Sequence, residues 1–139
     1  MGTIAKYAAL LLLPALLAGC AGGESLGYAD NRGAVNQPYP ANYRTEIVAF
    51  LKTYLNNPAG VRDAEMAEPV QRTVGGTVRF VSCLRFNQRE ADGSYRGARD
   101  RAVVYVDGRL DRIMENAGDL CAGASYARFP ELEKMVRTP

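Results

Sequence analysis

The chain has 139 residues, of which 47% are hydrophobic, and a formal net charge of +2. This length allows a single domain, and so small a charge does not favour nucleic-acid binding. The chain has three cysteines and no histidine, which excludes Ser-His and Cys-His catalytic arrangements and a typical zinc site. We therefore expect no metal and no cofactor.

The first segment, residues 1–19, has the pattern of a signal peptide. Lys6 supplies a positive charge, and an apolar run from Tyr7 to Leu17 follows it, interrupted only by Pro14. This run is too short to cross a membrane, which needs about 20 apolar residues. A run of this length that ends in small residues is typical of a cleaved export signal.

The segment Leu17-Ala18-Gly19-Cys20 resembles the lipobox of bacterial lipoproteins. The resemblance implies cleavage before Cys20 and acylation of its thiol and new amino group, so that acyl chains hold the protein in a membrane. Ala21 follows the cysteine, which under the enterobacterial sorting rule favours the outer membrane, with the domain in the periplasm. The alternative is an ordinary signal peptide cut nearby, which leaves Cys20 as a free thiol.

The mature chain is predicted to begin with a tether, residues 20–41, that has no apolar period and is rich in Gly, Asn, Ala and Pro. One domain, residues 42–139, follows. Its first element is a helix that begins after Asn42, a suitable N-cap, and ends near Asn56-Asn57-Pro58. The apolar positions at helical spacing are Tyr43, Ile47, Phe50, Leu51 and Tyr54.

After this helix the pattern alternates. Residues 61–70 are predicted as a strand that lies at an edge or ends at Pro69, because proline cannot donate to a ladder. A turn at 74–77 leads to the strongest predicted strand, residues 77–89. One face of this strand holds Val78, Phe80, Ser82, Leu84 and Phe86, and the other holds Thr77, Arg79, Val81, Cys83 and Arg85.

Two more strands are predicted over residues 100–106 and 109–116, joined by Asp107-Gly108, a type I′ hairpin signal. The tail is irregular until a short helix begins near Pro130. We therefore expect an α+β fold with one long N-terminal helix packed on a three- to four-stranded antiparallel sheet, and a short C-terminal helix.

The remaining cysteines, Cys83 and Cys121, are predicted to form a disulfide, since an exported chain is in an oxidising compartment. The alternative is two separate buried thiols. The odd cysteine, Cys20, then has the separate role of anchor.

No catalytic constellation stands out. Glu65 and Glu68 are three residues apart and would point to opposite faces of a strand, and Asp107 and Asp111 flank a tight turn. The mature chain is rich in arginine, with 14 Arg and 2 Lys, and arginine is enriched at interfaces. Four residues of the loop 87–101 are candidates for contact with an anionic partner: Arg89, Tyr95, Arg96 and Arg99. The alternative is a solvated sheet face that is partly paired with its own carboxylates.

Beyond the lipobox, the chain is similar to short lipoproteins of Gram-negative bacteria, and loosely to BamE of the β-barrel assembly machine. That lipoprotein also has a tether and a helix-plus-sheet domain, but it places two helices before three strands. We expect a non-enzymatic accessory, scaffold or inhibitor module that binds an outer-membrane or periplasmic protein, and not nucleic acid. The alternative is a protein that binds or cleaves peptidoglycan or another envelope glycan.

Overall fold

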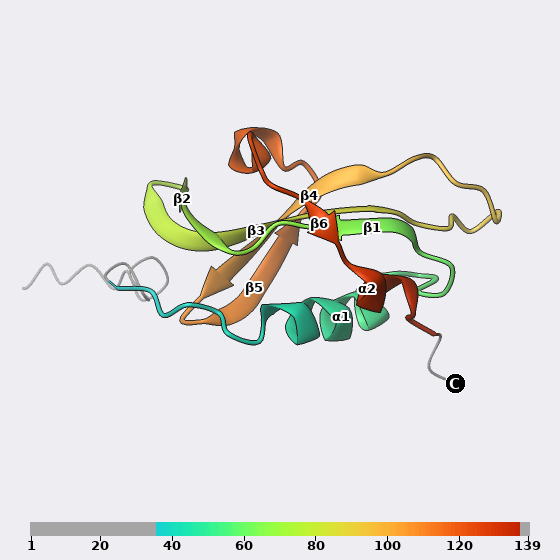
Figure 1. Cartoon of the computed structure of the whole chain (residues 1–139), viewed down its shortest axis with the longest axis horizontal. Helices are drawn as coiled ribbons and strands as arrows, with labels where there is room; N and C mark the ends of the chain where they lie inside the picture. Colours follow the sequence, from blue (N-terminus) through green and yellow to red (C-terminus); the bar gives the residue numbers. More distant parts are fainter. Residues whose placement is uncertain (1–35, 137–139) are drawn as a thin grey trace, which may run out of the picture.

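The computed structural model describes residues 36–136, which form one helix-and-sheet unit (Figure 1). The chain order is α1 (Tyr43–Tyr54), β1 (Arg62–Met66), β2 (Val70–Val74), β3 (Thr77–Asn87), β4 (Arg99–Val106), β5 (Arg109–Met114), a 3₁₀ turn η1 (Gly118–Cys121), β6 (Ala127–Arg128) and α2 (Pro130–Glu133). All strand pairs are antiparallel, in the order β5-β4-β3-β1-β6, and β2 pairs with β3 as well.

The predicted α+β class is confirmed, with one N-terminal helix and a short C-terminal helix, but the sheet has six strands rather than three to four. The segment 61–70, predicted as one strand, ends at Met66, and a second strand begins at Val70. The break lies where Pro69 removes a ladder donor. The two-residue β6, which pairs with β1, was not predicted because so short a strand leaves no periodic pattern.

Both turns of the sheet agree with their sequences. Gly75 and Gly76 have φ values of 57° and 80°, and Asp107 and Gly108 have 50° and 74°. Two successive positive φ angles define the type I′ turn, which a two-residue loop needs in order to match the twist of its strands. β2 and β3 therefore form one hairpin, and β4 and β5 form the other.

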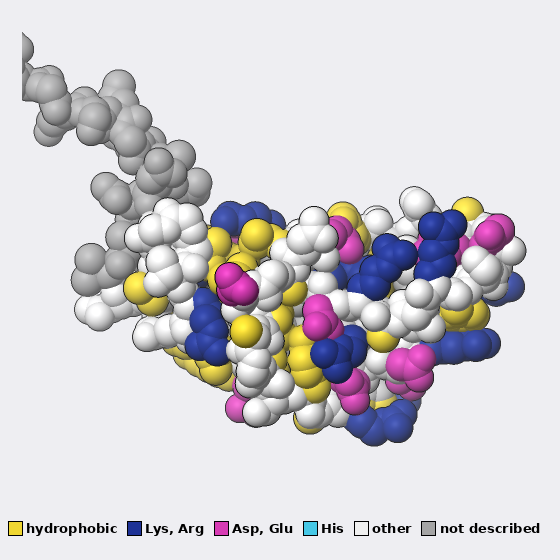
Figure 2. Space-filling view, turned by 90° about the horizontal axis from the view of Figure 1, so that it is seen from above, with side chains coloured by type: hydrophobic (Ala, Val, Ile, Leu, Met, Phe, Trp, Pro, Cys, Tyr) yellow, Lys and Arg dark blue, Asp and Glu magenta, His cyan; other side chains and the backbone are white. Residues whose placement is uncertain are grey.

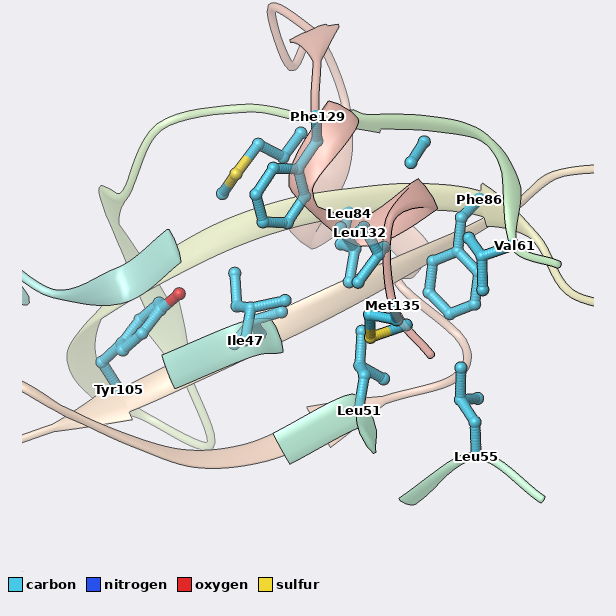
Figure 3. Close-up of a cluster of buried hydrophobic side chains, with 13 residues drawn as sticks. Ile47, Leu51, Leu55, Val61, Leu84, Phe86, Tyr105, Phe129, Leu132 and Met135 are labelled. Atoms are coloured by element: carbon cyan, nitrogen blue, oxygen red, sulfur yellow. The ribbon is translucent and has the colours of Figure 1, made fainter. Parts of the chain in front are cut away.

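The helix side of the sheet holds the main core (Figure 3). Ile47 and Leu51 of α1 pack there, and the predicted face of β3 contributes Leu84 and Phe86. The fully buried Tyr105 donates its hydroxyl to Ser82 at 3.2 Å, and burial raises the pKa of this phenol. Three residues of the tail complete the cluster: Phe129, Leu132 and Met135.

The opposite side of the sheet carries a smaller core. Val81 and Cys83 of β3 and Val104 of β4 pack there against η1. The predicted disulfide is confirmed: Cys83 and Cys121 are bonded, with their Cα atoms 5.6 Å apart. The disulfide holds the tail across the central strand. The two faces of β3 contribute to different cores, as the alternation of its side chains predicts.

The chain enters the domain through residues 36–42, beside the turn between β4 and β5. Gln37 accepts a hydrogen bond from the Asp107 backbone at 2.9 Å, Tyr39 packs edge-on against Phe80, and Pro40 is fully buried. The last residues of the predicted tether therefore contact the domain. Asn42 occupies the N-cap position of α1, although its side chain makes no capping hydrogen bond.

Candidate functional site

The predicted anchor, Cys20, lies outside the described residues, as do the predicted signal peptide and residues 20–35 of the predicted tether. Among residues 36–136, no helix is long and apolar enough to span a membrane. The candidate site that the structure does describe is the arginine loop, which we define as residues 88–99 between β3 and β4.

The arginine loop lies at one end of the long strand β3, and the residues where the chain enters the domain lie at the other end (Figure 1). Strand β3 has eleven residues, which at about 3.3 Å per residue separates its two ends by roughly 36 Å. The arginine loop and residue 36, the first described residue, therefore lie at opposite ends of the sheet.

Tyr95 has a structural role in this loop. It pairs with Arg89 in an isolated β-bridge, and its hydroxyl donates to the Gly60 carbonyl at 2.7 Å. The guanidinium of Arg62 stacks on its ring, 4.0 Å from the centroid, a favourable cation–π arrangement. Tyr95 thus fixes the loop against the turn before β1, and little of its polar capacity is left for a partner.

The arginines of this end of the sheet are exposed, although the guanidinium of Arg62 also stacks on Tyr95. Arg89, Arg96 and Arg99 are exposed, as is Arg62, which the sequence did not single out. None of the four forms an ion pair with a carboxylate of the described part of the chain. No sequence signal connects Arg62 with the loop, because the two meet only through the pairing of β1 with β3.

The remaining arginines of the central region have partners within the domain. Arg85 forms an ion pair with Asp100, Arg109 with Glu46, and Arg112 with Asp111. Arg101 is only 3% exposed; it donates to Glu115 at 2.8 Å and stacks on Phe86. Among the arginines from Arg85 to Arg112, those without an ion pair in the described part of the chain are therefore at the loop end of the sheet.

Two carboxylates near the loop are already engaged. Asp92 accepts bonds from the Ser94 hydroxyl and backbone, which lower its pKa, so it stays ionised. The Arg85 guanidinium lowers the pKa of Asp100. Tyr126, whose ring packs under Arg85, has a raised pKa because it is buried and lies near Asp100. Neither acid forms an ion pair with Arg89, Arg96 or Arg99, although the charge of Arg96 contributes to the lowered pKa of Asp92.

The side of the sheet away from α1 is seen in Figure 2, where basic and acidic side chains alternate around exposed apolar ones. A groove of about 450 Å³ lies at the edge of the sheet between β2 and the tail, and residues from both sides of the sheet line it. Its lining mixes apolar side chains with Arg44, Glu68 and Arg72, and Arg44 donates from both Nε and Nη2 to the Glu131 carboxylate. Within residues 36–136 there is no group of three or more His, Cys, Asp or Glu that could hold a metal.

Comparisons of the chain with protein-family models, with curated proteins and with solved structures found no match.

Proposed function

We propose that this chain is a non-catalytic lipoprotein of the cell envelope, anchored by Cys20, that binds a protein partner through its arginine loop. The pairing of the cysteines carries the proposal. Cys83 and Cys121 are bonded to each other, which leaves Cys20, at the end of the Leu17-Ala18-Gly19 sequence, as the single cysteine available for acylation.

The position of the loop supports the binding role. An anchor before residue 36 attaches the domain at the end of the sheet opposite to the arginine loop (Figure 1). The loop then faces away from the anchoring membrane, toward proteins of the adjacent compartment. Exposed guanidinium groups that are not held in an ion pair make bidentate contacts with carboxylates, so the expected partner surface is acidic.

Reversing the charge of Arg89, Arg96 and Arg99 together is expected to abolish this partner contact. We would purify the full-length protein from detergent-solubilised membranes and identify the proteins that accompany it. A stoichiometric partner should accompany the parent protein and be lost from the variant with all three arginines changed to Glu, because like charges across an interface cost several kcal/mol.

The matched control carries the same change of charge elsewhere: Lys52→Glu, Arg112→Glu and Arg128→Glu, three exposed positions outside the loop. This control should retain the partner. A partner that stays bound to the loop variant would contradict the assignment of the surface, and a parent protein that purifies without a stoichiometric partner would contradict protein binding itself.

A further inference from the structure

Among the residues that the structure describes, the outer edge of strand β2 beside the tail pairs with no other strand. Strands β1 and β2 both pair with the same side of β3 and are separated by residues 67–69. Strand β6 extends the sheet beyond β1, where Met66 is opposite Ala127. Among the described strands, β2 pairs with β3 alone. The position beyond β2, in line with β6, is thus open to one more strand.

The register of the hairpin shows which backbone groups face this edge. Val74 is opposite Thr77 across a two-residue turn, so these residues exchange hydrogen bonds. Pairs then alternate along an antiparallel ladder, and the N–H and C=O of Gln71 and Thr73 point away from β3. The Gln71 carbonyl accepts one bond from the Arg72 guanidinium at 3.1 Å and has a second lone pair for another donor.

The groove of about 450 Å³ lies directly along this edge, within the size range of binding pockets. It forms where the tail leaves the sheet, so one wall is β2 and the other is the segment that precedes β6. Val81, Cys83 and Leu120 provide an apolar lining, and Val70 lies at the β2 side with 43% of its surface exposed. A side chain of an added strand on this face would extend into the groove.

The edge of β2 carries positively charged side chains on the face that borders the groove. Arg72 is opposite Arg79 in the β2–β3 register, so the two side chains lie on the same face of the hairpin as Val81 and Cys83. Arg72 forms no ion pair with a carboxylate in the described part of the chain, and its guanidinium lies at the free edge. Glu68 also lines the groove, but it forms no ion pair with Arg72 in the described part of the chain. A carboxylate of an added strand beside Arg72 would therefore form an ion pair that the described residues do not supply.

From these observations we propose that the outer edge of β2 binds an extended peptide segment of a partner protein as an added strand. The segment pairs with the backbone of Gln71 and Thr73, places an acidic side chain beside Arg72, and places an apolar side chain beside Val70 in the groove. Because residues two apart share a face, the acidic and apolar residues are separated by one position. This site is distinct from the arginine loop and does not depend on the anchor.

A random peptide library displayed on phage, panned against the full-length protein in detergent, tests the proposal. Enriched peptides should contain Asp or Glu two positions from an apolar residue. A synthetic peptide of the enriched sequence should bind the parent protein, and Thr73→Pro should weaken that binding roughly tenfold, since the change removes one outward N–H donor. Proline is tolerated on the solvent side of an edge strand, and a thermal melt checks that the variant is folded.

A charge exchange provides the second variant. Arg72→Glu should weaken binding of the acidic peptide, and replacing the acid of the peptide by Lys should restore it. Arg112→Glu, the same substitution on the same face of the sheet, should leave binding unchanged. Absence of an enriched sequence would overturn the proposal, as would binding that neither Thr73→Pro nor Arg72→Glu alters. A dimer formed through β2 that Thr73→Pro converts to monomer would assign the edge to a second copy instead, and would also overturn it.

Discussion

Replacing Cys83 and Cys121 together by alanine is expected to lower the free energy of unfolding by about 4 kcal/mol. The bridge closes a loop of 38 residues. In the chain-entropy model, loss of this constraint raises the conformational entropy of the unfolded chain and so stabilises the unfolded state. The disulfide also acts in the folded state, because it cross-links η1 to the central strand β3. Urea unfolding followed by circular dichroism measures the change.

The control for this prediction is Cys20→Ala, which should leave the unfolding midpoint of the domain unchanged because Cys20 is not part of the bridge. A dithiol reductant should reproduce the effect of the double variant on the parent protein. A loss below about 1 kcal/mol would contradict the account, since it would mean that the tail is held by packing alone.

Phe129→Ala is expected to destabilise the domain by about 3–5 kcal/mol, the usual cost of removing a buried phenylalanine ring. Phe129 is fully buried between α1 and the sheet (Figure 3). Its backbone N–H donates to the Ala64 carbonyl at 2.8 Å, and the Arg44 guanidinium lies 4.7 Å from its ring centroid. The change therefore creates a cavity and loosens the tail where it meets β1.

The comparison for Phe129→Ala is Val136→Ala in the same tail, at a side chain that is 68% exposed. This second change should shift the unfolding midpoint very little. Equal effects of the two substitutions, measured by urea unfolding, would show that the tail does not complete the core.

The parts of the fold that were predictable are those whose own residues repeat with a clear period. The stripe from Tyr43 to Tyr54 predicted α1, and the alternation around Cys83 predicted both faces of β3. The Asp107-Gly108 pair predicted the β4–β5 turn, because few other residues adopt its positive φ angles. In each case the local sequence and the tertiary packing require the same conformation.

The missed strands lack such a pattern. In β2, Val70, Gln71 and Thr73 are all exposed, so no buried face imposes an alternation, and β6 has only two residues. The role of the tail was missed for a related reason. Phe129, Leu132 and Met135 enter the core from a four-residue helix and its flanks, and a segment so short cannot show which face is buried.

The sequence predicted that the candidate site is rich in arginine, but it did not predict which of these arginines are exposed. The sequence indicated an arginine excess and placed Arg89, Arg96 and Arg99 near one predicted loop, yet it could not separate Arg99 from Arg101. These two arginines are two residues apart, but one is exposed and the other is buried against Phe86. Their partners, such as Glu115 for Arg101, are set by the strand register, which no local pattern specifies.

Whether Cys20 is the membrane anchor is tested most directly by the mass of the N-terminal peptide of the mature protein, purified from membranes of a Gram-negative host. We expect the peptide to begin at Cys20 and to carry acyl chains on both the thiol and the amino group. We also expect Cys20→Ala to prevent acylation while the domain remains folded. A mature chain that begins elsewhere, or that carries an unmodified Cys20, would contradict the anchor and with it the proposed function.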